Sequence, residues 1–271
     1  MNDFLEKIIS ERLLAINEAK KTIPTADLRE RAISRRPERS LLAALRSAPK
    51  GRANIIAEMK RASPSEGTLR PDLEPKKLAR EYAKAGAAAI SVLTEPKYFL
   101  GKDQDITDVR RAVKIPILRK DFTVDPWQVY QSALFGADVI LLIAAALDLP
   151  LLNKLYMAAC EARLETIIEV HTLPELKTAL QFEKAIVGVN SRNLKTLKTD
   201  LGIAMELAKH IPKRRIAIAE SGIRNRSDIE RLTEAGYRGF LIGTSLLKAE
   251  SPGAALKNLM DLPQKCAKNI K

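Results

Sequence analysis

The chain has 271 residues, of which 46% are hydrophobic and 4% aromatic, which is enough apolar material for one large domain or two small ones. No apolar run approaches the roughly 20 residues that span a bilayer, and the charged N-terminal segment lacks the apolar stretch of a signal peptide, so we expect a cytoplasmic protein and no membrane partner. The net charge of +13 keeps a nucleic-acid-binding protein open as an alternative, although acidic residues are interspersed with the basic ones and stacking aromatics are scarce.

The first part of the chain, residues 1–50, is predicted to be a helical extension that packs on the main domain, residues 51–271. An amphipathic helix is expected from about Phe4 to Lys20, and a short one from Leu41 to Arg46. The charged stretch RERAISRRPERS lies between them. Because these segments stand outside the repeat that follows, we expect the extension to help close the active face of the main domain.

From Asn54 onward one unit repeats: an aliphatic run, a polar loop and an amphipathic segment. The aliphatic runs predict eight strands, at NIIAEMK, AAAISVLT, IPILRKD, ADVILLIAA, ETIIEV, AIVGVN, RIAIAES and GFLIG. Helices are predicted between them at LEPKKLAREYAKAG, DPWQVYQSALFG, LPLLNKLYMAACEA, TLPELKTALQ, LGIAMELAKHI and RSDIERLTEAG. Alternation of this kind indicates a parallel sheet covered by helices.

Eight such units favour an α/β protein with a closed (β/α)8 TIM barrel. A doubly wound open sheet has the same local pattern. However, neither GxGxxG nor GxxxxGK[ST] follows the first predicted strand, so the usual signatures of the open nucleotide-binding sheets are missing from the sequence.

Polar side chains fall at the ends of several predicted strands, where barrel enzymes carry their reacting groups. They are Glu58, Lys60, Lys120, Glu169 and Asn190. Each alone has a structural explanation, such as a buried ion pair or a turn cap. Structural ion pairs have no reason to gather at the same end of different strands, so together they predict a catalytic site.

Small residues follow the last two predicted strands, at Ser221 and Gly222 and at Gly243 and Thr244. Such residues let backbone N–H groups approach an anion closely, and these two loops often bind phosphate in a barrel. The alternative is a pair of tight turns. Their position favours a phosphorylated small-molecule substrate.

The histidines and cysteines predict neither a metal nor a cofactor. His171 and His210 have no partners at ligand spacing, and Cys160 and Cys266 form no CxxC pattern. We therefore expect no metal site, no cofactor, and reduced structural thiols.

Seven stretches together resemble the indole-3-glycerol phosphate synthase family, and the resemblance spans almost the whole chain. They are IIAEMKRASPSEG, SVLTEPKYFLG, ILRKDFTVDPWQVYQSALFGAD, IIEVH, VGVNSRNL, AESGI and FLIGTSLL. The resemblance implies a decarboxylating ring closure and dehydration of 1-(2-carboxyphenylamino)-1-deoxyribulose 5-phosphate to indole-3-glycerol phosphate, in tryptophan biosynthesis.

The resemblance also implies roles for matching residues. Lys120 would be the general acid, Glu169 the proton acceptor with Glu58 assisting it, and Lys60 a cation for the substrate's anions that can also act as an acid. Substrate contacts are implied for Ser63, Phe99, Phe122, Leu141, Asn190, Arg192, Ser221, Gly222, Gly243 and Thr244. Which lysine donates which proton stays open at this point.

Two other functions remain as alternatives. One is another phosphate-binding barrel enzyme, such as a sugar-phosphate isomerase, although the expected Cys or Asp acid-base pair is not found at the strand ends. The other is a nucleic-acid-binding protein that uses the basic surface. We expect a monomer, with a homodimer as the alternative.

Overall fold

The computed structural model describes residues 3–35, 39–47, 51–193 and 196–261. Eight parallel strands close into a barrel in the order β1-β10-β9-β8-β7-β6-β5-β4. The barrel strands are β1 (Ile55–Met59), β4 (Ala89–Leu93), β5 (Ile117–Lys120), β6 (Val139–Ile143), β7 (Glu165–Val170), β8 (Ile186–Asn190), β9 (Ala217–Glu220) and β10 (Gly239–Ile242). All eight coincide with the predicted runs, and the expected TIM barrel is confirmed.

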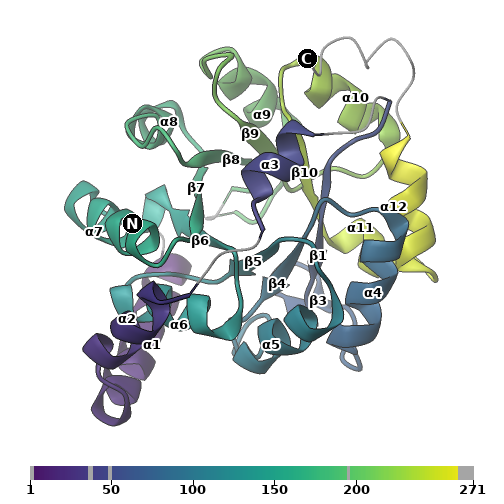
Figure 1. Cartoon of the computed structure of the whole chain (residues 1–271). Coiled ribbons are helices and arrows are strands. Elements are labelled where there is room, and N and C mark those ends of the chain that lie inside the picture. The colour runs from purple at the N-terminus through teal and green to yellow at the C-terminus, as the bar shows by residue number, and fades with distance from the viewer. Residues whose placement is uncertain (1–2, 36–38, 48–50, 194–195, 262–271) are drawn as a thin grey trace.

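Helices surround the strands (Figure 1). They are α4 (Pro75–Ala85), α5 (Asp103–Ala112), α6 (Pro126–Phe135), α7 (Leu149–Glu161), α8 (Leu173–Ala179), α9 (Leu201–Ala208), α10 (Arg226–Glu234), α11 (Thr244–Leu247) and α12 (Pro252–Met260), with a 3-10 turn, η1 (Ala144–Ala146). A small hairpin, β2 (Ala62–Ser63) and β3 (Gly67–Thr68), lies in the loop after β1. None of the described helices is long and apolar enough to cross a membrane.

Local sequence explains where these helices begin and end. In α6 the carboxylate of Asp125 accepts a hydrogen bond from the backbone N–H of Trp127, and Pro126 occupies the first helical position, where its missing N–H costs nothing. Gly136 ends the helix with a φ of 100°, a conformation that side chains with a β-carbon rarely adopt. Helix α5 was not predicted because only Ile106 and Val109 are apolar and buried on its inner face.

Side chains inside the barrel follow the alternation of the strands. A compact apolar cluster fills the interior and includes Ile56, Leu118, Ile167, Ile218 and Leu241. The opposite faces of the strands join the larger core beneath the helices. Since side chains alternate along a strand, a residue two positions after an interior one points into the same interior, nearer the carboxyl end.

The N-terminal segment contains α1 (Asp3–Thr22), α2 (Thr25–Ile33) and α3 (Leu41–Arg46). Helix α2 falls partly in the charged stretch and was not predicted. Helices α1 and α2 lie beside α6 (Figure 1), and the indole N–H of Trp127 donates to the carbonyl of Ile23 at 2.9 Å. This placement ties the segment between α1 and α2 to the barrel.

Helix α3 covers the amino-terminal end of the barrel, in front of the strands in Figure 1. Leu41 and Leu45 are fully buried in the interior cluster. The carboxylate of Glu165, at the start of β7, accepts hydrogen bonds from the hydroxyl of Ser40 and from the backbone N–H of Leu42. The expectation that the extension helps to close the active face therefore cannot apply to α3, which seals the opposite end.

Candidate functional site

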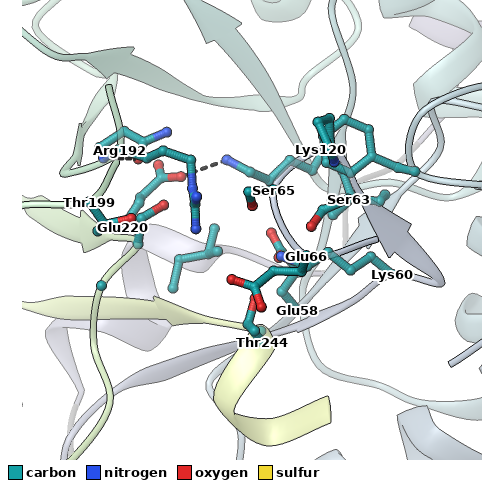
Figure 2. A pocket seen from close by; sticks show the side chains of 18 of the residues that line it. Glu58, Lys60, Ser63, Ser65, Glu66, Lys120, Arg192, Thr199, Glu220 and Thr244 are labelled. Carbon is teal, nitrogen blue, oxygen red and sulfur yellow. Dashed lines mark hydrogen bonds and ion pairs between the residues drawn. The ribbon is translucent and has the colours of Figure 1, made fainter. Parts of the chain in front are cut away.

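A cavity of about 600 Å³ opens at the carboxyl-terminal ends of the strands. Every residue predicted for the site lines it: Glu58, Lys60, Ser63, Phe99, Lys120, Phe122, Leu141, Glu169, Asn190, Arg192, Ser221, Gly222, Gly243 and Thr244. Figure 2 shows Arg192 and Glu220 on one side of this cavity and Ser63 and Lys60 on the other. The structure brings the predicted residues together, while their individual roles stay predictions.

Lys120 sits at the centre of a buried charge cluster. Its Nζ lies 2.6 Å from Oε2 of Glu220 and 3.0 Å from Oε2 of Glu169. Lys120 is the last residue of β5 and Glu220 the last of β9, and both carboxylate side chains are no more than 3% exposed. One ammonium group is therefore held between two carboxylates in a site that excludes most water.

The cluster shifts the pKa of each of its members. Burial alone would lower the pKa of Lys120, but the nearby carboxylates of Glu169, Glu220 and Glu58 outweigh it and raise that pKa. Burial opposes ionisation of Glu169, yet Lys120, His171 and Asn190 lower its pKa to about 2. Burial, together with the charges of Glu169 and Glu58, raises the pKa of Glu220 to about 7 against the pull of Lys120. Near neutral pH Lys120 is therefore charged, Glu169 is ionised, and Glu220 is protonated in part of the molecules.

The raised pKa of Glu220 predicts a pH dependence of stability. Between pH 4.5 and pH 7 the folded protein holds a proton on Glu220 that the unfolded chain has released, so the free energy of unfolding falls as the pH rises through this window. The neutral variant Glu220→Gln has no proton to release at this position, so its free energy of unfolding lacks this decrease. We expect the free energy of unfolding of the parent to decrease relative to that of Glu220→Gln between pH 5 and pH 7, with a limiting slope of about 1.4 kcal/mol per pH unit, and its melting temperature to fall with it. Parallel melting curves of the two proteins across this range would contradict the assignment.

Lys60 and Glu58 form a second pair at the end of β1. Nζ of Lys60 donates to Oε1 of Glu58 at 2.6 Å, and the side chains are 13% and 5% exposed. Gly243, on the neighbouring strand end, makes room for this carboxylate: a β-carbon there would lie 2.5 Å from Oε1 of Glu58. The glycine that was predicted for phosphate binding thus also determines the position of Glu58.

The loops after β9 and β10 form one wall of the cavity. Ser221 and Gly222 both have positive φ angles, of 66° and 79°, which turn the chain sharply after Glu220. The hydroxyl of Ser245 donates to the carbonyl of Ile223 at 3.4 Å and links the two loops. These loops lie where a small-residue anion site is expected, and phosphate binding by them stays a prediction.

The opposite wall is apolar. The rings of Phe99 and Phe122 lie 6.4 Å apart, tilted by 42°, and Leu141 is buried on the floor of the cavity. Among the described residues, the buried hydroxyl of Ser63 finds no hydrogen-bond partner. The cavity lining therefore combines an apolar wall with a hydroxyl that can bind a polar group.

Asn190 and Arg192 approach from the end of β8. The side-chain oxygen of Asn190 accepts the backbone N–H of Arg192 at 3.0 Å. The guanidinium of Arg192 donates to the carbonyl of Leu197 at 2.7 Å. These bonds hold a cation at the mouth of the cavity, where it can meet an anionic group.

Several residues that line the cavity are not among the predicted ones, and two groups of them bear on the proposed chemistry. Glu220 follows Ile218 by two positions on β9, so the alternation that identifies Lys120 and Glu169 also identifies Glu220. The second group is Phe4 and Leu5 of α1, which line the cavity from a helix far away in sequence. No local pattern predicts this contact, because it depends on how α1 packs.

An ion pair fixes α1 over the site. Arg12 donates to Oδ2 of Asp121 at 2.7 Å, and the hydroxyl of Thr94 donates to the same carboxylate at 2.5 Å. Asp121 also accepts the backbone N–H of Phe122 at 2.8 Å. The loop that carries the ring pocket is therefore linked directly to the N-terminal helix.

Within the described ranges, no group of three histidine, cysteine or acidic side chains could hold a metal ion. His171 is nearly buried beside Glu169, whereas His210 is exposed. Cys160 is a free thiol on the exposed face of α7, which does not fit the structural role expected for it, and Cys266 lies outside the described residues.

Sequence comparisons identify close relatives. A family model described as indole-3-glycerol phosphate synthase matches residues 5–259. A protein of that name from Carboxydothermus hydrogenoformans is 42% identical over 262 residues, covering 95% of this chain and 99% of the relative. Another of the same name from Syntrophobacter fumaroxidans is 42% identical over 259 residues, covering 96% and 98%.

Solved structures agree on the fold. Thiamine phosphate pyrophosphorylase from Pyrococcus furiosus superimposes with a TM-score of 0.58 at 15% identity, over 82% of this chain and 98% of that one. The 3-hexulose-6-phosphate synthase of Salmonella typhimurium gives 0.63 at 11% identity, over 80% and 100%. At such low identity, these two structures support the barrel fold and no functional conclusion.

Proposed function

The chain belongs to the indole-3-glycerol phosphate synthase family, and from this premise we propose how its cavity performs the family's reaction. The enzyme is a decarboxylating lyase of tryptophan biosynthesis. It closes the ring of 1-(2-carboxyphenylamino)-1-deoxyribulose 5-phosphate and releases carbon dioxide and water. The observation that carries the proposed mechanism is the placement of Lys120 between two buried carboxylates, beside an apolar ring pocket.

Lys120 acts as the general acid for ring closure. As the aromatic carbon attacks the sugar carbonyl, the carbonyl oxygen gains charge and takes a proton from Nζ to become a hydroxyl. The carboxylates of Glu169 and Glu220 keep the ammonium charged before substrate binds and aim it into the cavity. Lys120 is therefore protonated before the step that needs its proton.

Loss of carbon dioxide from the attacking carbon restores the aromatic ring, and Glu169 then acts as the base of the dehydration. Its low pKa keeps it ionised, so it can accept the proton that leaves the carbon next to nitrogen in the new five-membered ring while the neighbouring hydroxyl departs as water. Oε2 of Glu169 and Nζ of Lys120 lie 3.0 Å apart, so the proton can pass from the carboxyl to the amine at the end of the cycle. This transfer restores both groups without a further proton donor.

Lys60 and Glu58 act on the substrate's anionic groups and in the later loss of water. Lys60 lies near the loops that are proposed to bind phosphate, and it supplies positive charge for the substrate's anions. It also acts as the acid when the hydroxyl leaves as water, and it then takes back from solvent the one proton that the overall reaction consumes. Glu58, which accepts its hydrogen bond at 2.6 Å, orients this ammonium and assists Glu169.

Binding combines three contacts. The substrate's phosphate lies against the backbone of Gly222, Gly243 and Thr244. Its carboxylate contacts Arg192 and the unpartnered hydroxyl of Ser63. Its ring packs between Phe99 and Phe122, with Leu141 below. For Thr244, a backbone contact is preferred to one from the side chain.

Gly243→Ala is expected to impair both binding and turnover. The added β-carbon falls 2.5 Å from Oε1 of Glu58, so the carboxylate and Lys60 must shift while the phosphate is pushed away from its N–H donors. Overpacking of this kind costs about 1–3 kcal/mol, which corresponds to a fall in kcat/KM of about 5- to 150-fold, divided between a higher KM and a lower kcat. Steady-state kinetics test this, with Gly202→Ala as a control, because Gly202 is exposed near the start of α9 and the nearest atoms to an added β-carbon all belong to the exposed side chain of Asp200. A change in KM alone would limit Gly243 to phosphate binding.

A monomer stays the expected active unit, with a homodimer as the alternative. The positive surface is proposed to speed capture of the anionic substrate and not to bind nucleic acid. A cytoplasmic location likewise stays a prediction.

The experiment that tests the function mixes the purified protein with the carboxyphenylamino sugar phosphate, without added metal or cofactor, and follows indole fluorescence. Product should appear together with carbon dioxide in equal amount. Consumption of substrate without carbon dioxide, or a folded protein that forms no indole product, would overturn the proposal.

A further inference from the structure

His171 directly follows β7 and lies two residues after Glu169. Its Nε2 is 3.4 Å from Oε1 of Glu169, and its side chain is 10% exposed. Lys120 occupies the other carboxylate oxygen, Oε2, at 3.0 Å. The imidazole and the ammonium group therefore approach Glu169 through different oxygens.

The second ring nitrogen of His171 is also partnered. Nδ1 lies 3.3 Å from Oε2 of Glu175 in α8, and the same oxygen accepts the backbone N–H of His171 at 2.7 Å. The backbone N–H of Glu175 in turn donates to the hydroxyl of Thr172, which caps the helix. Glu175 is thus held in place from both sides and fixes the orientation of the imidazole ring.

The surroundings of His171 favour its charged form. Burial would lower its pKa, but Glu175, Glu169 and Glu220 outweigh burial and raise it. These groups come from α8, β7 and β9, while the adjacent η1, Ala144–Ala146, supplies no titratable side chain. An imidazolium in this position donates a hydrogen bond to Glu175 through Nδ1, whereas Nε2 makes no hydrogen bond and acts on Glu169 through its charge at 3.4 Å.

We propose that His171 is a positioning residue for the reaction: backed by Glu175, it holds the carboxylate of Glu169 ionised and turned so that Oε2 faces Lys120 and the substrate. This role deepens the proposed function and rests on Glu169 being the base. A carboxylate free to rotate would offer Oε2 to Lys120 for only part of the time, and one without the imidazolium would take up a proton at higher pH. His171 touches neither the cavity nor the reacting atoms, so it acts only through Glu169.

The test compares kcat and KM from pH 5 to pH 9 in the full-length enzyme carrying His171→Phe, His171→Asn or Glu175→Gln. His171→Phe keeps the ring volume and removes both donors. We expect kcat of His171→Phe at neutral pH to be about tenfold below that of the parent. The parent's kcat should fall above neutral pH, where the imidazolium loses its proton, and this fall should be absent from His171→Phe. KM should change less than about threefold. His171→Asn, whose amide can donate to Glu169, should recover part of kcat, and Glu175→Gln, which removes a carboxylate that favours the imidazolium, should move the fall in kcat to lower pH.

The chain offers a matched control in His210, an exposed histidine whose Nε2 lies 3.9 Å from a glutamate four residues away, Glu206. His210→Phe should leave kcat, KM and the pH profile unchanged. A folded His171→Phe enzyme with the parent's pH profile would overturn the positioning role, as would a loss of kcat that is equal at every pH and not relieved in His171→Asn. If Glu169→Gln keeps the parent's turnover, the proposed base is wrong instead, so the two failures are distinguishable.

Discussion

Turnover of the Lys120→Met variant is expected to fall by at least ~10²-fold, because a positioned general acid contributes typically 10²- to 10⁴-fold in rate. Methionine keeps much of the stem and removes the charged donor. Substrate affinity should change less than ~10-fold, since the phosphate loops and the ring pocket remain. Single-turnover rates at saturating substrate, followed by indole fluorescence, measure the first effect, and titration of the inactive variant measures the second.

The substitution also removes the cation between Glu169 and Glu220, which are both buried. The two carboxylates should respond by taking up a proton, so the variant is expected to fold with reduced stability. Lys154→Met, on the exposed face of α7, is the control for loss of a lysine. Lys60→Met should lose affinity as well as rate. If Lys120→Met turns over within a few-fold of the parent while Lys60→Met is inactive with unchanged binding, the roles of the two lysines must be exchanged.

Glu169→Gln should have the second large effect, a fall in kcat of about 10²- to 10⁴-fold with little change in binding. Glutamine preserves the shape of the side chain and a hydrogen-bonding oxygen, but it cannot accept the proton. Glu220→Gln should cost at least ten times less, because Glu220, with its pKa raised to about 7, already holds a proton for part of the time near neutral pH.

The comparison of these two variants at pH 7.5 identifies the base. Both replace a buried carboxylate that contacts Nζ of Lys120, so they disturb the cluster to a similar extent. A larger loss of kcat in Glu220→Gln than in Glu169→Gln would transfer the role of the base to Glu220.

Most of the barrel could be predicted because its strands carry simple signals. The aliphatic runs identify the strands, and alternation places Lys120 two residues after the interior Leu118 and Glu169 two after Ile167. Glu220 follows the same rule and could have been predicted with them. It is flanked by the more conspicuous Ser-Gly turn, which has its own explanation as an anion site.

Other parts of the site have no local signal. The contact of Phe4 with the cavity depends on the packing of α1 against the barrel, and the Arg12 to Asp121 ion pair joins residues 109 positions apart. The steric relation between Gly243 and Glu58 exists only because the closed barrel makes β1 and β10 neighbours. Such contacts depend on the tertiary structure, and local patterns in a single sequence do not predict them.

Gly188, on β8, makes room for a carboxylate in the same way. A β-carbon at this position would lie 2.4 Å from Oε1 of Glu220 and 2.7 Å from the side chain of Ile167. Alanine at position 188 would therefore displace both side chains, and it should cost less once residues 220 and 167 are smaller. Glutamate at position 220 should likewise cost less while position 188 is glycine. The order in which such substitutions occur, and not only their identity, then affects which variants of this active site can arise.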